Sequence, residues 1–145
     1  MDEDLGPWDL ETPIPALQSV TRDTTFVALD LEGPHSAISE VGLARISLST
    51  IRVFAPGKQG HRWLNKSTSR HYRVEELKDY RGRRGNPESY SRSRFVPKAE
   101  LRKSIELALQ KYTSGGMANF VLVGHGVHND IEKLKKILDL DIETM

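Results

Sequence analysis

The sequence contains no cysteine at any of its 145 positions. Disulfide frameworks and zinc sites built from thiolates are therefore excluded, and the absence fits a reducing compartment inside the cell. No apolar run approaches the roughly 20 residues that span a bilayer. The acidic start, Met1 to Asp9, lacks the positive charge and the apolar stretch of a signal peptide. We therefore expect an intracellular protein, cytoplasmic or nuclear, with no membrane partner.

Charged side chains are plentiful, and they are distributed unevenly along the chain. Residues 1–57 hold three Lys/Arg against nine Asp/Glu, residues 58–103 hold fourteen against five, and residues 104–145 hold four against six. The net charge of +1 therefore conceals a strongly basic middle third, a pattern found on nucleic-acid-binding surfaces. Hydrophobic residues make up 37% of the sequence, enough for one domain with a real core.

The hydrophobic pattern predicts a chain in which strands come first and helices alternate with a strand later. The expected elements are strands at 24–32, 41–49 and 50–54, a helix at about 97–112, a strand at 120–123, a helix with Asn129 as its N-cap and Glu132 in capping-box position, and the start of a further strand at 140–145. Short connections make the second and third strands antiparallel neighbours, and a crossover places strand 120–123 parallel to strand 24–32. This order predicts an α/β fold with a mixed central sheet flanked by helices.

Two segments fall outside this regular pattern. Residues 1–22 are acidic and contain three prolines, so we expect an irregular acidic leader in front of a domain at 23–145. Residues from about 57 to 95 are polar and basic and are interrupted by glycine and proline. This composition predicts a mobile basic insertion within the domain.

Asp30 and Glu32 lie at the end of the first predicted strand. Side chains at i and i+2 share one face of a strand, so the two carboxylates project together and repel each other unless a cation sits between them. Their oxygen atoms suit Mg²⁺ or Mn²⁺. Asp130, in the first turn of the second helix, reaches the same edge if strand 120–123 is a parallel neighbour. The alternatives are a solvated strand end for the pair and a favourable helix-dipole contact for Asp130.

The segments around these carboxylates resemble two motifs of a known family. Phe26–Gly33 with Ile38–Gly42 is similar to the first motif of the DEDD (DnaQ-like) 3′–5′ exonucleases of the RNase H-like superfamily, and Leu122–Asp130 is similar to the second. The spelling Gly-His-x-x-His-Asn-Asp is nearest to the RNA-exonuclease branch, of the DEDDh type. His71–Glu76 resembles a segment of a fungal exonuclease-like branch. The resemblance covers about residues 24–145 and implies the RNase H-like fold.

The resemblance also implies an activity and roles for individual residues. It implies a metal-dependent exonuclease with a two-metal site for Mg²⁺ or Mn²⁺ and with RNA or single-stranded DNA as the substrate. Asp30 would bridge both ions, Glu32 would ligate the more tightly held ion, and Asp130 would orient the site. The backbone beside Leu31 and Gly33 would approach the terminal nucleotide. Two further motif residues, Glu40 and Gly42, would serve packing.

The family's third motif has no counterpart in the sequence. That motif supplies a fourth metal-binding Asp and a His or Tyr that activates water, yet no His-x4-Asp or Tyr-x3-Asp follows Asp130. We therefore expect a C-terminally incomplete domain that contains no general base. General acid–base assistance is worth about 10²–10⁴-fold in rate, so these 145 residues are expected to be weakly active or inactive. The alternatives are a catalytically incomplete RNase H-like module that binds nucleic acid, and a protein-interaction domain with merely exposed carboxylates.

Arginine and aromatic residues alternate through the basic insertion. Arginine binds phosphate, and aromatic rings stack on unpaired bases, so this mixture suits a single-stranded partner. The candidate nucleic-acid contacts are Arg73, Arg81, Arg83, Arg84, Arg92 and Arg94. The alternative is a solvated loop that binds nothing specific. An affinity for labelled RNA that falls with salt would distinguish the first interpretation from the second.

Overall fold

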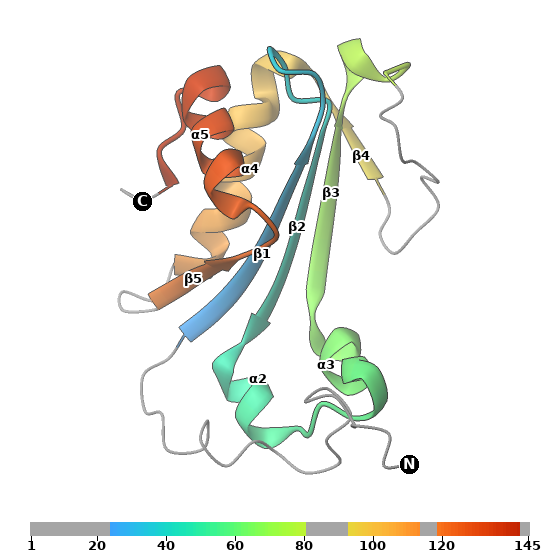
Figure 1. Ribbon diagram of the computed structural model, residues 1–145, viewed down its shortest axis with the longest axis vertical. Helices are drawn as coiled ribbons and strands as arrows, with labels where there is room; N and C mark the ends of the chain where they lie inside the picture. Colours follow the sequence, from blue (N-terminus) through green and yellow to red (C-terminus); the bar gives the residue numbers. More distant parts are fainter. Residues whose placement is uncertain (1–23, 81–92, 114–118, 143–145) are drawn as a thin grey trace.

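A five-stranded mixed sheet in the order β4-β3-β2-β1-β5 forms the centre of the computed structural model, which describes residues 24–80, 93–113 and 119–142 (Figure 1). The strands are β1 (Thr24–Glu32), β2 (Glu40–Ser47), β3 (Thr68–Val74), β4 (Ser93–Val96) and β5 (Asn119–Val123). The helices are α2 (Leu48–Val53), α3 (His61–Lys66), α4 (Lys98–Thr113) and α5 (Val127–Leu138), with 3₁₀ turns η1 (Lys58–Gly60) and η2 (Glu75–Leu77). No helix in these described ranges is long and apolar enough to cross a bilayer. The predicted α/β fold with a mixed sheet is confirmed.

Strand β1 lies between an antiparallel and a parallel neighbour. It pairs antiparallel with β2, in a register that runs from Thr25 opposite Ser47 to Glu32 opposite Glu40. On its other side it pairs parallel with β5. The predicted parallel placement of the late strand beside the first strand is therefore confirmed.

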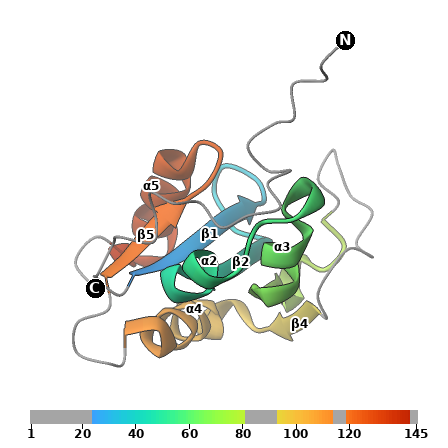
Figure 2. The ribbon, with the colours of Figure 1, turned by 90° about the horizontal axis from the view of Figure 1, so that it is seen from below.

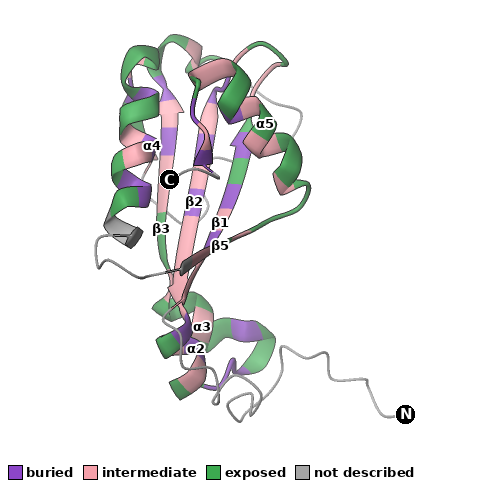
Figure 3. Cartoon of the chain, turned by 90° about the vertical axis from the view of Figure 1, so that its left-hand side faces the viewer, coloured by how far each residue is buried: buried purple, intermediate pink, exposed green. Residues whose placement is uncertain are grey.

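One face of the sheet is buried under α4 and α5, which both lie in front of the strands in Figure 3. Strand β1 has the alternation of a half-buried strand, with every second side chain in the core. The largest contributors to the core are Val27, Leu29 and Leu31 from β1, Leu101, Ile105 and Leu109 from α4, and Leu134 from α5. Because successive side chains point to opposite faces, the same alternation sends Asp30 and Glu32 to the other face of β1.

The strand predicted at 50–54 is wrong, because Leu48–Val53 form helix α2. The helix begins after Ser47, whose Oγ accepts a hydrogen bond from the backbone N–H of Thr50 at 3.2 Å. A hydroxyl at this position satisfies an amide that has no partner within the first helical turn. A short apolar run does not by itself distinguish a strand from a helix, and the serine decides the outcome here.

Two parts of the predicted basic insertion at about 57–95 are strands of the central sheet, so these parts are not a mobile excursion from the fold. Within it, β3 pairs antiparallel with β2 and parallel with β4, so the segment supplies two strands of the central sheet. Tyr72 and Val74 of β3 are buried in the core. Residues 81–92 of the predicted insertion lie outside the described residues, and so does the predicted leader at 1–22.

Helix α5 begins three residues earlier than predicted. It follows Gly126, which has a left-handed backbone (φ 69°), and Asn129 lies inside the first turn, so Asn129 is not the N-cap. Glu132 is therefore not in capping-box position, and its carboxylate instead forms an ion pair with His128 at 3.2 Å. Up to Ile142, the last described residue, the chain after α5 forms no strand.

Candidate metal and nucleic-acid site

Asp30 and Glu32 stand together at the C-terminal end of β1. Both side chains are exposed, and both lie on the face of the sheet opposite α4 and α5. Asp30 is directly opposite Gly42 of β2, and Glu32 is directly opposite Glu40. The structure therefore places the two carboxylates on one face of the strand, as their spacing predicts.

Asp130 reaches this end of β1 through the turn between β5 and α5. The parallel register ends with Val123 opposite Ala28 of β1. The chain then passes through Gly124, where an added Cβ would lie only 3.0 Å from the carbonyl oxygen of Leu29. A side chain at this position would crowd the close approach to β1, so glycine suits the turn. Helix α5 starts three residues later and carries Asp130 in its first turn.

Asp30 and Glu32 lie close enough to Asp130 to influence its ionisation. Burial raises the pKa of Asp130, and the negative charges of Asp30 and Glu32 raise it further, while Lys133 lowers it. In the described part of the chain, however, no three acidic or histidine side chains converge into a ready-made metal cluster. Asp30 and Glu32 therefore act on Asp130 through their charges, although the three side chains do not meet as a metal cluster.

Lys133 is a member of this site that sequence reasoning missed. It follows Asp130 by three residues on α5, and its Nζ donates a hydrogen bond to the carbonyl oxygen of Gly33 at 3.1 Å. The ammonium group therefore sits beside the end of β1, within range of the Asp130 charge. The signal in the sequence was the i, i+3 spacing, which places two residues on the same face of a helix.

Gly33 closes the loop that follows Glu32. Its φ of +133° disfavours other residues, and an added Cβ would lie 2.7 Å from both the Ala37 oxygen and the Ser39 nitrogen. The Ser39 N–H donates a hydrogen bond to the carbonyl oxygen of Glu32 at 2.9 Å, which links the two ends of the loop. The side chain of Leu31 is buried in the core, so only its backbone is available to a ligand. A glycine at position 33 is thus required by packing, whatever approaches it from outside.

Glu40 is directed away from the carboxylate pair by β3. Two acidic side chains directly opposite each other, such as Glu32 and Glu40, destabilise an antiparallel pair. The Glu40 carboxylate instead contacts His71 Nε2 at 3.0 Å and Arg73 Nε at 3.3 Å. The other ring nitrogen of His71 is hydrogen-bonded to the hydroxyl of Ser93 at 2.8 Å. Glu40 thereby links strands β2 and β3 through charge.

The predicted nucleic-acid-binding arginines have different surroundings. Arg73 is half-buried, with its Nη2 donating to the Lys78 carbonyl oxygen at 3.3 Å and its guanidinium 5.3 Å from the centre of the Phe95 ring. Arg94 of β4 is exposed. The remaining candidates, Arg81, Arg83, Arg84 and Arg92, lie outside the described residues. The guanidinium of Arg73 therefore contacts other groups of the protein, whereas the side chain of Arg94 is exposed to solvent.

Replacing Asp130 with asparagine is expected to stabilise the chain at neutral pH when no metal ion is present. Since the pKa of Asp130 is raised above 3.8 on folding, the folded chain holds this proton more tightly than the unfolded chain does. The group therefore favours folding at acid pH, and this contribution is lost as the pH rises from 3.8 through the raised pKa. At pH 7 the variant should unfold on the order of 1–3 °C higher.

Thermal unfolding in the presence of a chelator between pH 3.5 and pH 7.5 measures this effect. The exposed Asp79, which lies on the loop after η2, provides the control variant Asp79→Asn. The difference between the two variants should grow from acid to neutral pH. An equal midpoint for both variants across the whole range would contradict the electrostatic coupling.

The sequence profile of one protein family matches most of the chain. That family is described as DNA polymerase III subunit epsilon-like, C-terminal domain (DEDDh_C), and the match covers residues 25–145. It includes every strand and helix described above except the first residue of β1. No curated protein matches the chain.

Proposed function

We propose that this chain, which belongs to the DEDDh (DnaQ-like) exonuclease family, is a metal-dependent 3′–5′ exonuclease domain acting on RNA or single-stranded DNA. Membership of the family gives it a nuclease-like function, a nucleic acid as the substrate, and a relationship to enzymes that generally use divalent metals. The finer proposal rests on one arrangement of the chain. Strand β5 runs parallel to β1 and leads through Gly124 into α5, so Asp130 comes to the end of β1 that carries Asp30 and Glu32, about 100 positions earlier.

The chemistry of the three side chains fits Mg²⁺ or Mn²⁺. Asp30, Glu32 and Asp130 supply only carboxylate oxygens, which hard divalent ions prefer, and their mutual repulsion falls when a cation binds. Bound there, divalent ions would supply Lewis-acid chemistry for phosphodiester hydrolysis. The chain itself would hold the ions through these carboxylates, and the backbone at Leu31 and Gly33 would border the terminal nucleotide.

A catalytically incomplete module that binds nucleic acid is the second candidate function. The observation that favours it is that no three acidic or histidine side chains among the described residues form a metal cluster. We propose that residues 23–145 form one domain, and under this second function it binds nucleic acid without cleaving it.

A single-turnover assay with excess protein tests the proposal and separates the two candidates. A 5′-labelled single-stranded RNA of 20 nucleotides should be shortened slowly, one nucleotide at a time from its 3′ end, with Mn²⁺ and not with a chelator. Binding of the RNA with no shortening would favour the module without catalysis. Internal cleavage, or shortening that persists in the chelator, would contradict a metal-dependent 3′–5′ exonuclease.

A further inference from the structure

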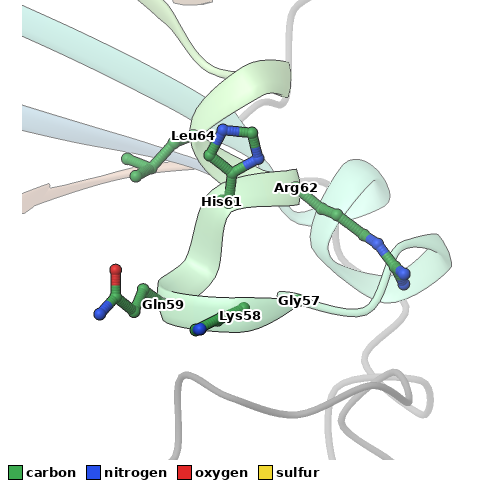
Figure 4. A pocket seen from close by; sticks show the side chains of 6 residues that line it. All are labelled: Gly57, Lys58, Gln59, His61, Arg62 and Leu64. Atoms are coloured by element: carbon green, nitrogen blue, oxygen red, sulfur yellow. The ribbon is translucent and has the colours of Figure 1, made fainter.

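A pocket at the opposite end of the sheet from the three carboxylates is lined by basic side chains. It has a volume of about 430 Å³ and lies where η1 leads into α3 (Figure 4). We call it the basic pocket, and its lining residues are Gly57, Lys58, Gln59, His61, Arg62 and Leu64. Pockets of this size accommodate small organic groups such as a nucleobase with its sugar.

The segment that forms the basic pocket carries charge of one sign only. Between Leu48 and Ser67 the sequence contains two lysines, two arginines and one histidine, with no aspartate or glutamate. Lys58 and His61 are exposed at the basic pocket. The ammonium of Lys66 lies 4.8 Å from the centre of the Phe54 ring. A polyanion would therefore meet no acidic side chain of this segment. The rings of Phe54 and His61 are aromatic surfaces on which a base can stack.

Exposed apolar side chains next to the basic pocket also require an explanation. Val53 is 68% exposed, Leu64 is 65% exposed and the Phe54 ring is 40% exposed. The backbone is strained as well, because Gln59 has a left-handed conformation (φ 52°) that non-glycine residues rarely adopt. A surface that is merely solvated needs neither feature, whereas a ligand with both phosphates and rings makes use of cations and apolar side chains together.

The distance to the carboxylates follows from the register of β1. Helix α2 starts directly after Ser47, which is opposite Thr25, whereas Glu32 lies seven residues further along the strand. At about 3.3 Å per residue, Thr25 and Glu32 are roughly 23 Å apart along β1. Figure 1 shows α2 and α3 beyond the end of the sheet where β1 begins, so the basic pocket is at least this far away. A single strand with its 3′ end at Glu32 needs about seven stacked nucleotides to reach it.

We infer that the basic pocket is a second binding site for the single-stranded substrate, which holds a nucleotide well upstream of the 3′ end. Lys58 contacts backbone phosphate, and the imidazole of His61 stacks on a base beside Leu64. This inference rests on the proposed function, because it assumes a polynucleotide whose 3′ end lies at the carboxylates. The site binds long single strands more tightly than short ones and has no effect on substrates too short to reach it.

Fluorescence anisotropy on the full chain tests this inference with labelled RNAs of 4 and 20 nucleotides in a chelator. Lys58→Glu should weaken binding of the 20-nucleotide RNA about tenfold and reduce the slope of log affinity against log salt by roughly 0.7 or more. Binding of the 4-nucleotide RNA should be unchanged. His61→Ala should weaken binding of the long RNA about fivefold through lost stacking. Both replaced side chains are exposed, so the variants should keep the circular dichroism spectrum and midpoint of the parent chain.

Lys103→Glu on α4 is the matched control, since Lys103 is an exposed lysine remote from the basic pocket in sequence. It should change the affinity for the long RNA less than twofold. Equal losses for Lys58→Glu and Lys103→Glu, or an equal loss for both RNA lengths, would overturn the second site while leaving the proposed function intact. Binding of poly-glutamate that Lys58→Glu weakens, together with RNA binding that Lys58→Glu leaves unchanged, would instead assign the basic pocket to an acidic polypeptide. Failure of the parent chain to bind the 20-nucleotide RNA in the chelator would overturn the second site, whereas the proposed function is decided separately by the metal-dependent shortening assay.

Discussion

Replacing Asp30 with asparagine is expected to remove the stabilisation of the chain by Mg²⁺ or Mn²⁺. A ligand that binds only the folded state at 100 times its Kd stabilises that state by about 2.7 kcal/mol. For a chain of this length the gain corresponds to a rise in Tm of roughly 5–10 °C. Asparagine has nearly the same shape but no charge, so the variant should gain about 1 °C or less. Residual shortening of RNA should fall to background as well.

The Asp30→Asn result has a second signature that depends on charge rather than on shape. One negative charge disappears from beside Asp130, so the pKa of Asp130 should move down toward its ordinary value. Thermal shift with titrated metal measures the first effect, and carboxyl NMR titration measures the second. Asp79→Asn, at an exposed site, should leave both unchanged. A full metal-induced rise in Tm for Asp30→Asn would contradict the assignment of this carboxylate to the metal.

Truncating Leu134 to alanine is expected to have the largest effect on stability. Leu134 is fully buried on α5 and belongs to the cluster that includes Val27 and Leu29 of β1. Removing a buried leucine costs transfer free energy and leaves a cavity, together about 3 kcal/mol. Because α5 carries Asp130 and Lys133, looser packing should also weaken the metal-induced stabilisation. Urea unfolding with and without Mn²⁺ measures both losses.

Lys136 provides a control for Leu134→Ala on the same helix. Its side chain is exposed, and alanine favours helix at least as strongly as lysine. Lys136→Ala should therefore change the free energy of unfolding by no more than about 0.5 kcal/mol. If Leu134→Ala lost less than 1 kcal/mol, α5 would not be packed on the sheet as described, and the position of Asp130 would lose its support.

The candidate site was predictable where local spacing controls it. Asp30 and Glu32 share a face because side chains alternate along any strand, and this needed no knowledge of the neighbouring strands. The approach of Asp130 needed one topological rule, the parallel placement of β5 beside β1. Lys133 could not be placed in this way. Its hydrogen bond to Gly33 depends on the angle at which α5 crosses the end of β1, which only packing sets.

Elements with strong hydrophobic periodicity were determined by the sequence itself. The patterns of β1, α4, β5 and α5 gave their positions to within a few residues, because each buries a continuous apolar stripe or run. Together with the motifs around Asp30 and Asp130, they also determined the family, which the profile match over residues 25–145 confirms.

The tertiary structure alone decided the middle of the chain. Strand β3 is rich in polar residues, and it becomes a strand because β2 and β4 pair with it and Tyr72 and Val74 enter the core. The basic pocket likewise depends on how η1 and α3 fold beyond the end of the sheet (Figure 2). Local sequence fixes the elements that can bury an apolar face by themselves, whereas polar segments take their conformation from the neighbours that satisfy their hydrogen bonds.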